Sequence, residues 1–392
     1  MDNSLQALRT AVQQNCHITD AAHARGYTMC TYLLKMREYY RWEKGYPFSA
    51  SLPKDELGHW LEQREQLWEK LESAGFVPVP VGEKEYAPFD SEAINRALLP
   101  QGLIYGGGYG SHLAPHFFLG SLGRSERRGN LTVLVADKEF ARDLSAPPAM
   151  LRDTTILIRR ESLRRLLWER IEEWQWRKQE SAMTRAVAHY AFEQDAEQAL
   201  EQMTDNEIDA VILHELGEGR AGEILGAEWS DLLLAVSSSR AEIMARAVRD
   251  HLADCLSTLP ALLESGNSAS LHFYFANFKG MRRELFPQLL DAYRHWLASG
   301  SQNRLADEAQ RGARLWQETA VHLLSLYRTH GEESKALIEK ALEHLPQSRQ
   351  APEQPCACTT PGKRNNPSSL SELKEIGCKS ARASIFHRFL GQ

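Results

Sequence analysis

The residues best suited to catalysis or metal binding lie in one string, ILHELGEGRAGEILGAEW, at residues 212–229. There His214, Glu215, Glu218 and Arg220 follow directly on an apolar run. Polar side chains that follow a buried apolar run need hydrogen-bonding or charged partners, because burying an unpaired charge costs free energy. In a continuous helix, His214 and Glu218 would share one face, as metal ligands often do. We therefore predict that His214 and Glu218 bind a metal ion.

The string SSSRAEIMARAVRDHLADCL supplies the expected third ligand, His251, together with Asp250 and Asp254 on one predicted helix. A mixed His and carboxylate site suits Fe, Mn or Zn. Glu215 would then act as general base or as a further ligand, and Arg220 as a catalytic cation. The His-Glu pair resembles the start of the zinc-protease motif, but position 218 is Glu and not the second His, so that motif is absent.

A structural interpretation competes with the metal site. Gly217 and Gly219 could interrupt the helix, and the string would then be a helix terminus with capping charges and a salt bridge from Arg220 to a Glu. His189 and Glu193, four residues apart, are a further candidate pair, but a solvated helix face explains them equally well.

Three other clusters have weaker signals. In GGGYGSHLAPHFFLG, an extended chain would place His112 and His116 on one side, and the glycines predict a tight loop or bend without phosphate-loop spacing. Asp20 and His23 could couple as base and orienting carboxylate, or belong to a capping and salt-bridge network. The cysteines after residue 350 are spaced poorly for zinc, and no G-x-S-x-G motif indicates serine-based catalysis.

The elements that must position these residues are mainly helical. Residues 5–44 predict one or two helices with Leu33, Met36 and Tyr40 on an apolar face, and residues 55–73 predict an amphipathic helix. Five short β-like runs, divided by Gly, Pro and charged turns such as RSERRGN, follow up to residue 160. Further helices are expected at residues 161–194, 206–216, 228–236, 239–263, 281–297, 305–328 and 332–345.

This pattern predicts an α+β fold that is mainly α. We expect N-terminal helices with a small antiparallel sheet in residues 1–160, and a C-terminal helical bundle in residues 161–345. Residues 346–392 are rich in Pro, Gln, Ser and Asn, which predicts a flexible, disordered and basic tail.

Composition limits the class of protein. The chain has 392 residues and a formal charge of −6, of which the tail contributes +4, so the body is acidic and nucleic-acid binding is disfavoured. No apolar run is long enough to cross a bilayer, and no secretion signal opens the chain. Six scattered cysteines suggest reduced thiols, so we expect a cytoplasmic protein.

The string from Cys16 to Glu43, and more loosely the HELGEGR segment, resembles a family of bacterial proteins of unknown function. The resemblance extends over most of the chain before the tail. It implies no activity for any residue.

Two function hypotheses follow. The first is a metal-dependent enzyme acting on a small molecule through His214, Glu218, His251 and Glu215. The alternative is a noncatalytic helical adaptor that binds a protein partner, suggested by nine tryptophans and broad amphipathic helices. Burial of Trp60, Trp68 and Trp174 would remove the aromatic argument for an interface. A third possibility, binding of a small anion by Arg220, Arg127 and the glycine loop, requires a pocket that joins them.

Overall fold

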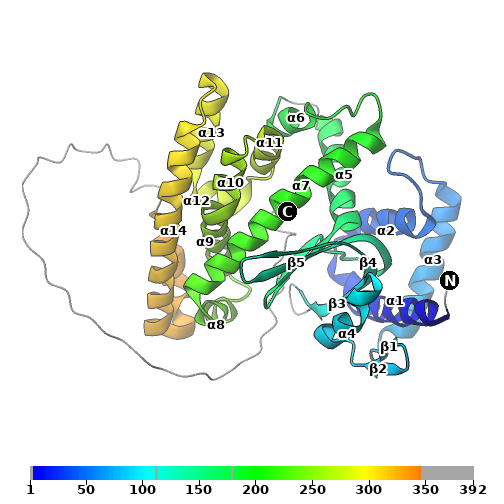
Figure 1. The fold of residues 1–392 in the computed structure, drawn as a ribbon. Coiled ribbons are helices and arrows are strands. Elements are labelled where there is room, and N and C mark those ends of the chain that lie inside the picture. The colour runs from blue at the N-terminus through cyan, green and yellow to red at the C-terminus, as the bar shows by residue number, and fades with distance from the viewer. Residues whose placement is uncertain (1–2, 111–113, 178–179, 346–392) are drawn as a thin grey trace, which may run out of the picture.

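The computed structural model describes residues 3–110, 114–177 and 180–345 (Figure 1). The N-terminal half combines helices with two sheets. Its elements are α1 (Asn3–His23), η1 (Ala24–Gly26), α2 (Met29–Lys44), α3 (Lys54–Leu71), β1 (Val79–Val81), β2 (Lys84–Tyr86), α4 (Ser91–Leu98), η2 (Leu99–Gln101), β3 (Leu103–Tyr109), β4 (Pro115–Arg128), β5 (Leu131–Arg142), β6 (Ala149–Arg152) and β7 (Thr155–Arg159).

The C-terminal half is helical in the residues that the structure describes. Its elements are α5 (Arg160–Arg177), α6 (Ala182–Val187), α7 (Ala196–Leu225), α8 (Glu228–Ala235), α9 (Arg240–Ala253), the π-helix η4 (Asp254–Thr258), α10 (Leu259–Glu264), α11 (Ser268–Ala276), α12 (Gly280–Leu285), α13 (Pro287–Ser299), α14 (Asn303–His330), η5 (Gly331–Glu333) and α15 (Ser334–Glu343). The predicted α+β, mainly α fold is thus confirmed, while the predicted tail lies outside the described residues.

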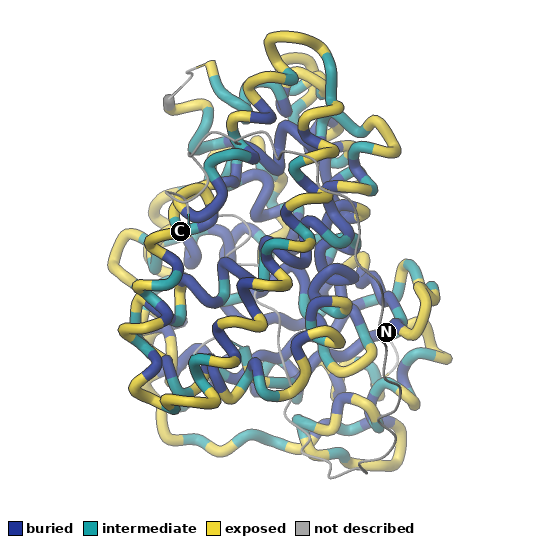
Figure 2. Tube along the Cα trace, turned by 90° about the vertical axis from the view of Figure 1, so that its left-hand side faces the viewer, coloured by how far each residue is buried: buried dark blue, intermediate teal, exposed yellow. Residues whose placement is uncertain are grey.

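The larger sheet links the two halves. Its strand order is β3-β4-β5-β7-β6, and all neighbours are antiparallel except β5 and β7. Side chains alternate along β5: Val133 and Val135 belong to the core shared with the C-terminal helices, whereas Leu134 and Ala136 pack with Ile104 on the other face. Figure 2 shows the buried segments continuing through the interior of the body, with exposed residues on its outer turns.

Several predicted boundaries change. The expected hairpin loop RSERRGN is mostly strand, since β4 continues to Arg128 and the turn needs only Gly129, at φ +64°, and Asn130. The run expected from residue 161 to 194 is split, because α5 ends at Arg177 and α6 starts at Ala182. These corrections reflect pairing with distant strands and helices, which local periodicity does not encode.

The apolar face predicted for α2 is wrong at Leu33. Leu33 and the adjacent Leu34 are 46% and 54% exposed, whereas Lys35 is only 7% exposed. Met36 and Tyr40 are buried as predicted. Packing of α2 between neighbouring elements therefore decides which face is buried, and it turns a lysine inward.

Helix α7 is continuous through Gly217 and Gly219, the glycines that left the extent of this helix undecided in the sequence. It runs for 30 residues and ends only at Gly226. A Cβ atom on Gly217 would lie 2.3 Å from the carbonyl oxygen of Ala253, and one on Gly219 would lie 2.9 Å from Leu131 Cδ1. These glycines therefore allow α7 to approach α9 on one side and the sheet on the other.

We predict that Gly217→Ala lowers the free energy of unfolding by about 1–3 kcal/mol, because the added methyl group meets backbone that cannot move away cheaply. Gly222→Ala in the same helix is the matched control, since no atom lies within 4 Å of its added Cβ. It should be neutral or stabilising by up to about 1 kcal/mol, as alanine is the better helix former. Urea unfolding of both variants checks this, and equal effects would contradict it.

Candidate functional site

The predicted ligand His214 lies in a buried ionic cluster at the centre of the helical half. Its Nδ1 is 2.9 Å from Asp254 Oδ1, and its Nε2 is 3.7 Å from Glu218 Oε1, which confirms that positions 214 and 218 share a helix face. Glu218 in turn accepts a hydrogen bond of 3.0 Å from Arg249 Nη2. Both ring nitrogens of His214 therefore face carboxylates.

Asp254, at the first position of the π-helix, gathers donors from several elements. Besides His214, its carboxylate accepts hydrogen bonds from Thr258 Oγ1 at 3.2 Å and from Tyr274 OH at 3.0 Å. Arg282 on α12 forms an ion pair with the same group. Since Asp254 is 0% exposed, these donors replace the water that the charge loses on folding.

The electrostatics fix the charge state of the cluster. Burial alone would lower the pKa of His214, but hydrogen bonds to Asp254 and Glu218 raise it to about 10. Burial would raise the pKa of Asp254, but Arg282 and His214 hold it below its usual value. At neutral pH the cluster therefore contains an imidazolium between two carboxylates.

The other predicted site residues have different surroundings. His251 is fully buried, stacks on Trp316 with ring centroids 4.7 Å apart, and lies with Nε2 3.0 Å from the carbonyl oxygen of Arg282. Glu215 is also fully buried, whereas Arg220 is exposed. Among the described residues, no group of three or more His, Cys, Asp or Glu could hold a metal ion. The metal site therefore stays a prediction.

Arg220 has a structural partner that explains its position. Its Nη1 donates to the carbonyl oxygen of Leu256, 3.0 Å away. In an α-helix that carbonyl would accept from residue 260, but Pro260 has no N–H. The guanidinium thus caps a carbonyl that the proline leaves open. The string does contain a helix terminus, at Leu225, but no salt bridge joins Arg220 to a Glu among the described residues.

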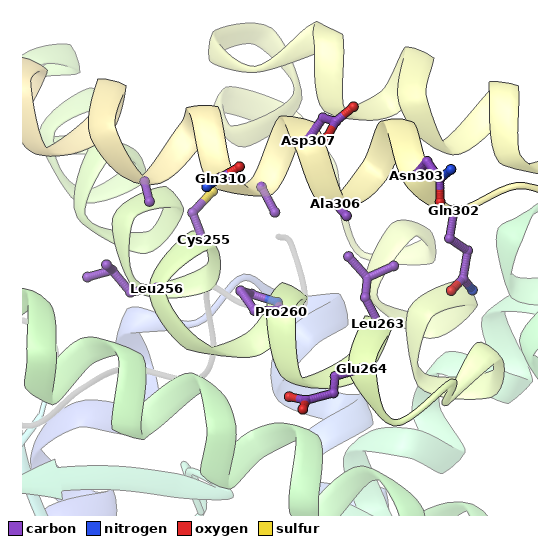
Figure 3. Close-up of a pocket in the computed structure, with 12 residues that line it drawn as sticks. Cys255, Leu256, Pro260, Leu263, Glu264, Gln302, Asn303, Ala306, Asp307 and Gln310 are labelled. Carbon is purple, nitrogen blue, oxygen red and sulfur yellow. The ribbon is translucent and has the colours of Figure 1, made fainter.

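The outer side of the same π-helix borders a hollow of about 640 Å³. Figure 3 shows residues of the π-helix and α10 facing α14 across it. The apolar or small side chains lining it are Cys255, Leu256, Pro260, Leu263, Ala306, Ala309 and Ala313, and the polar ones are Glu264, Gln302, Asn303, Asp307 and Gln310. We call this hollow the α10–α14 groove. The ionic cluster and the groove therefore share one π-helix.

A smaller hollow of about 300 Å³ continues along α14, lined by Arg314, Gln317, Glu318 and Val321. Val321 is 49% exposed. The two hollows together follow α14 from Gln302 to Val321, a length of about 28 Å at 1.5 Å per residue.

The weaker sequence clusters are described only in part. His116 lies with Nδ1 3.6 Å from Asp143 Oδ2, while His112 lies outside the described residues. Asp20 is buried and accepts from the backbone of Leu144, but His23 is exposed. His189 and Glu193 are exposed, and the cysteines after residue 350 lie outside the described residues.

The residues of the proposed anion site are also separate. The three glycines belong to strand β3, where Gly106 packs on Phe118 and Gly107 on the carbonyl of Pro88. Arg127 Nε donates to the carbonyl oxygen of Gly129 in its own hairpin, and Arg220 binds Leu256. The glycine run is therefore explained by close packing within and beside the sheet.

Sequence reasoning missed the buried polar groups at the junction of the two halves. Arg159 and Glu139 form a two-point ion pair with N···O distances of 3.1 and 2.7 Å, and both are buried. Lys35 and Asp143 are buried nearby on other elements. A signal was available for Lys35, since it occupies the helix position next to the apolar Met36, but only packing identifies the side that is buried.

We predict that His214→Gln lowers the free energy of unfolding by about 3–5 kcal/mol near pH 6, since it removes the cation that lies between two buried carboxylates. The folded-state pKa of His214, about 10, lies above the unfolded value of 6.5. Its stabilisation is therefore complete below pH 6.5 and is lost as pH rises towards 10. Urea unfolding at pH 6, 7.5 and 9 should show the difference between wild type and variant shrinking, by at most about 1.4 kcal/mol per pH unit. A constant difference would contradict the assignment.

Comparisons with known proteins give a family but no activity. The N-terminal domain of the family of unknown function DUF6866 matches residues 7–159, and the C-terminal domain of that family matches residues 164–345. No curated protein and no solved structure matches the chain. The two matches meet where β7 passes into α5, and together they include nearly all described residues. The chain therefore belongs to the family of unknown function DUF6866.

Proposed function

We propose that this protein is a helical binding module whose α10–α14 groove accepts an amphipathic helix of a protein partner. The observation that carries the proposal is the groove itself, which has an apolar floor and continues along one face of α14. An apolar trough beside an exposed helix is the usual receptor for the apolar stripe of a partner helix. A partner helix of about 18 residues matches its length.

Charge complementarity selects the kind of helix. Glu264 and Asp307 lie at the rim of the groove, and the body of the chain carries an excess of acidic residues. Leu256, Leu263 and the alanines of α14 would contact an apolar stripe. The preferred occupant is therefore a helix with basic residues beside its apolar stripe.

The proposed interface rests on the groove and not on the tryptophans. Trp60 and Trp68 are 6% and 5% exposed, so they belong to the core of the N-terminal half. Trp174 is partly buried and donates from Nε1 to Thr184 Oγ1. No helix among the described residues is long and apolar enough to cross a membrane. We further propose a cytoplasmic location and no role in nucleic-acid binding, in line with the acidic body.

A labelled 18-residue helix built from Leu and Lys in amphipathic order tests the proposal. Fluorescence anisotropy should detect its binding to the wild type, with weaker binding of the same helix in which Glu replaces Lys. Ala313→Arg should abolish binding by filling the groove, and Glu264→Lys with Asp307→Lys should weaken it at least about tenfold through repulsion.

Ser325→Arg is the matched control, because Ser325 is exposed on α14 beyond the groove-lining residues. It should bind the Leu/Lys helix like the wild type. Equal binding by Ala313→Arg and Ser325→Arg would mean that the probe binds elsewhere, and the proposal would then be wrong.

A second candidate is the metal-dependent enzyme, for which the side chains of His214 and Glu218 lie on one face of α7, with Nε2 and Oε1 3.7 Å apart. It predicts that protein purified without a His-tag contains Fe, Mn or Zn near one equivalent, and that a variant combining His214→Ala with Glu218→Ala loses it. Elemental analysis of both proteins decides this. Equal and negligible metal in the two proteins would exclude the candidate.

A further inference from the structure

The residues after Leu345 lie outside the described structure, but their sequence contains the pattern of one more amphipathic helix. Residues 369–372, Ser-Leu-Ser-Glu, have the spacing of a capping box, no proline follows them, and Gly391 comes directly after the last apolar residue. Between these signals, steps of three or four residues join Cys378, Ala381, Ile385 and Phe389. The sequence therefore predicts a helix over residues 370–390 with one apolar stripe.

Basic side chains flank this stripe. At 100° per residue, Lys379 and Arg382 fall on one side of the stripe and Arg388 falls on the other. The second half of the predicted helix contains no acidic residue. The first half has mixed charge, from Glu372, Lys374 and Glu375. The chain thus carries, in its own C-terminal segment, a helix of the kind that the α10–α14 groove would prefer.

The charges along the groove have a matching order. Among the described residues, the larger hollow is lined by the acidic residues Glu264 and Asp307 and by no basic one. The smaller hollow, further along α14, has mixed charge from Arg314 and Glu318. A helix with its basic half in the larger hollow and its mixed half in the smaller one therefore matches both hollows in charge.

The described chain ends at the level of the smaller hollow. After α14, η5 turns the chain and α15 packs back against α14. The ten residues of α15 span about 15 Å, and Val321 lies about 14 Å before the end of α14 at His330. The 24 residues from 346 to 369 can extend on the order of 80 Å, well beyond the length of the groove. No described residue of α15 lines either hollow, so α15 leaves the groove accessible to the segment that follows it.

We propose that residues 370–390 bind as a helix in the α10–α14 groove of the same chain, antiparallel to α14. The inference rests on the proposed function and names the chain's own C-terminal segment as an occupant of the groove. The charges set the direction: the mixed first half lies in the smaller hollow, where the described chain ends, and the basic second half lies beside Glu264 and Asp307. A partner helix must then displace this segment before it binds.

A labelled peptide with the sequence of residues 370–392 tests the inference by fluorescence anisotropy with the full-length protein. The stripe variant, Ile385→Gln with Phe389→Gln, removes the apolar anchors of the protein's own segment and should free the groove. It should bind the peptide about tenfold more tightly than the wild type. This factor corresponds to a tethered segment at an effective concentration of about 1 mM that binds the groove with a dissociation constant of about 0.1 mM. Adding Ala313→Arg to the stripe variant should abolish peptide binding.

Ser380→Gln with His387→Gln is the matched control, because it places the same two side chains on the side of the predicted helix opposite the stripe. It should bind the peptide like the wild type. Equal binding by the stripe variant and this control would overturn the inference.

The Leu/Lys helix separates this inference from the proposed function. If the stripe variant binds the Leu/Lys helix but not the peptide, the groove is a receptor and the inference alone is wrong. If it binds neither helix, both proposals are wrong.

Cross-linking identifies the copy that supplies the segment. A carbodiimide joins a lysine amine to a carboxylate in contact with it, so mass spectrometry of the cross-linked wild-type monomer should find Lys379 joined to Glu264 or Asp307. The stripe variant should lose this cross-link. The same cross-link found only in dimers would mean that a second copy's segment fills the groove, which would contradict binding within one chain.

Discussion

The buried charge of Asp254 constrains the whole helical half. A carboxylate without access to water requires charged and hydrogen-bonding partners, and here they come from α7, the π-helix, α11 and α12. Each partner must keep its position, so the relative placement of four elements is determined together. The close approach of α7 at Gly217 is part of the same arrangement, since the glycine lies against the carbonyl of Ala253.

The π-helix connects the buried ionic cluster to the surface of the protein. Asp254 anchors the inner side of the π-helix, while Cys255 and Leu256 line the groove on its outer side. The widened turn is closed by the N–H of Leu259, which donates to the carbonyl oxygen of Asp254. Pro260 has no N–H to donate to the carbonyl oxygen of Leu256, and Arg220 Nη1 donates to that oxygen instead. The buried ionic cluster and the groove therefore lie on opposite sides of the same π-helix.

The N-terminal half follows the same rule with different residues. Arg159 pairs with Glu139, and backbone amides donate to Asp143 and to one oxygen of Asp20, so buried acidic groups again hold loops and strands in place. Lys35 is buried as well, and the charges of Glu169 and Asp143 partly offset the effect of burial and of the nearby arginines on its pKa.

The class of fold, most of the helices and the face shared by His214 and Glu218 can be predicted from the amino-acid sequence, because hydrophobic periodicity and the four-residue helical spacing are local properties. The sequence did not determine the strand β6, the break between α5 and α6, or the inward turn of Lys35, since each depends on partners far along the chain. Asp254 was visible as a nearby carboxylate, but its contacts with Tyr274 and Arg282 were not. The charges that surround the His/Glu string come from residues far along the chain, so packing, and not local sequence, places Arg249, Asp254 and Arg282 around it.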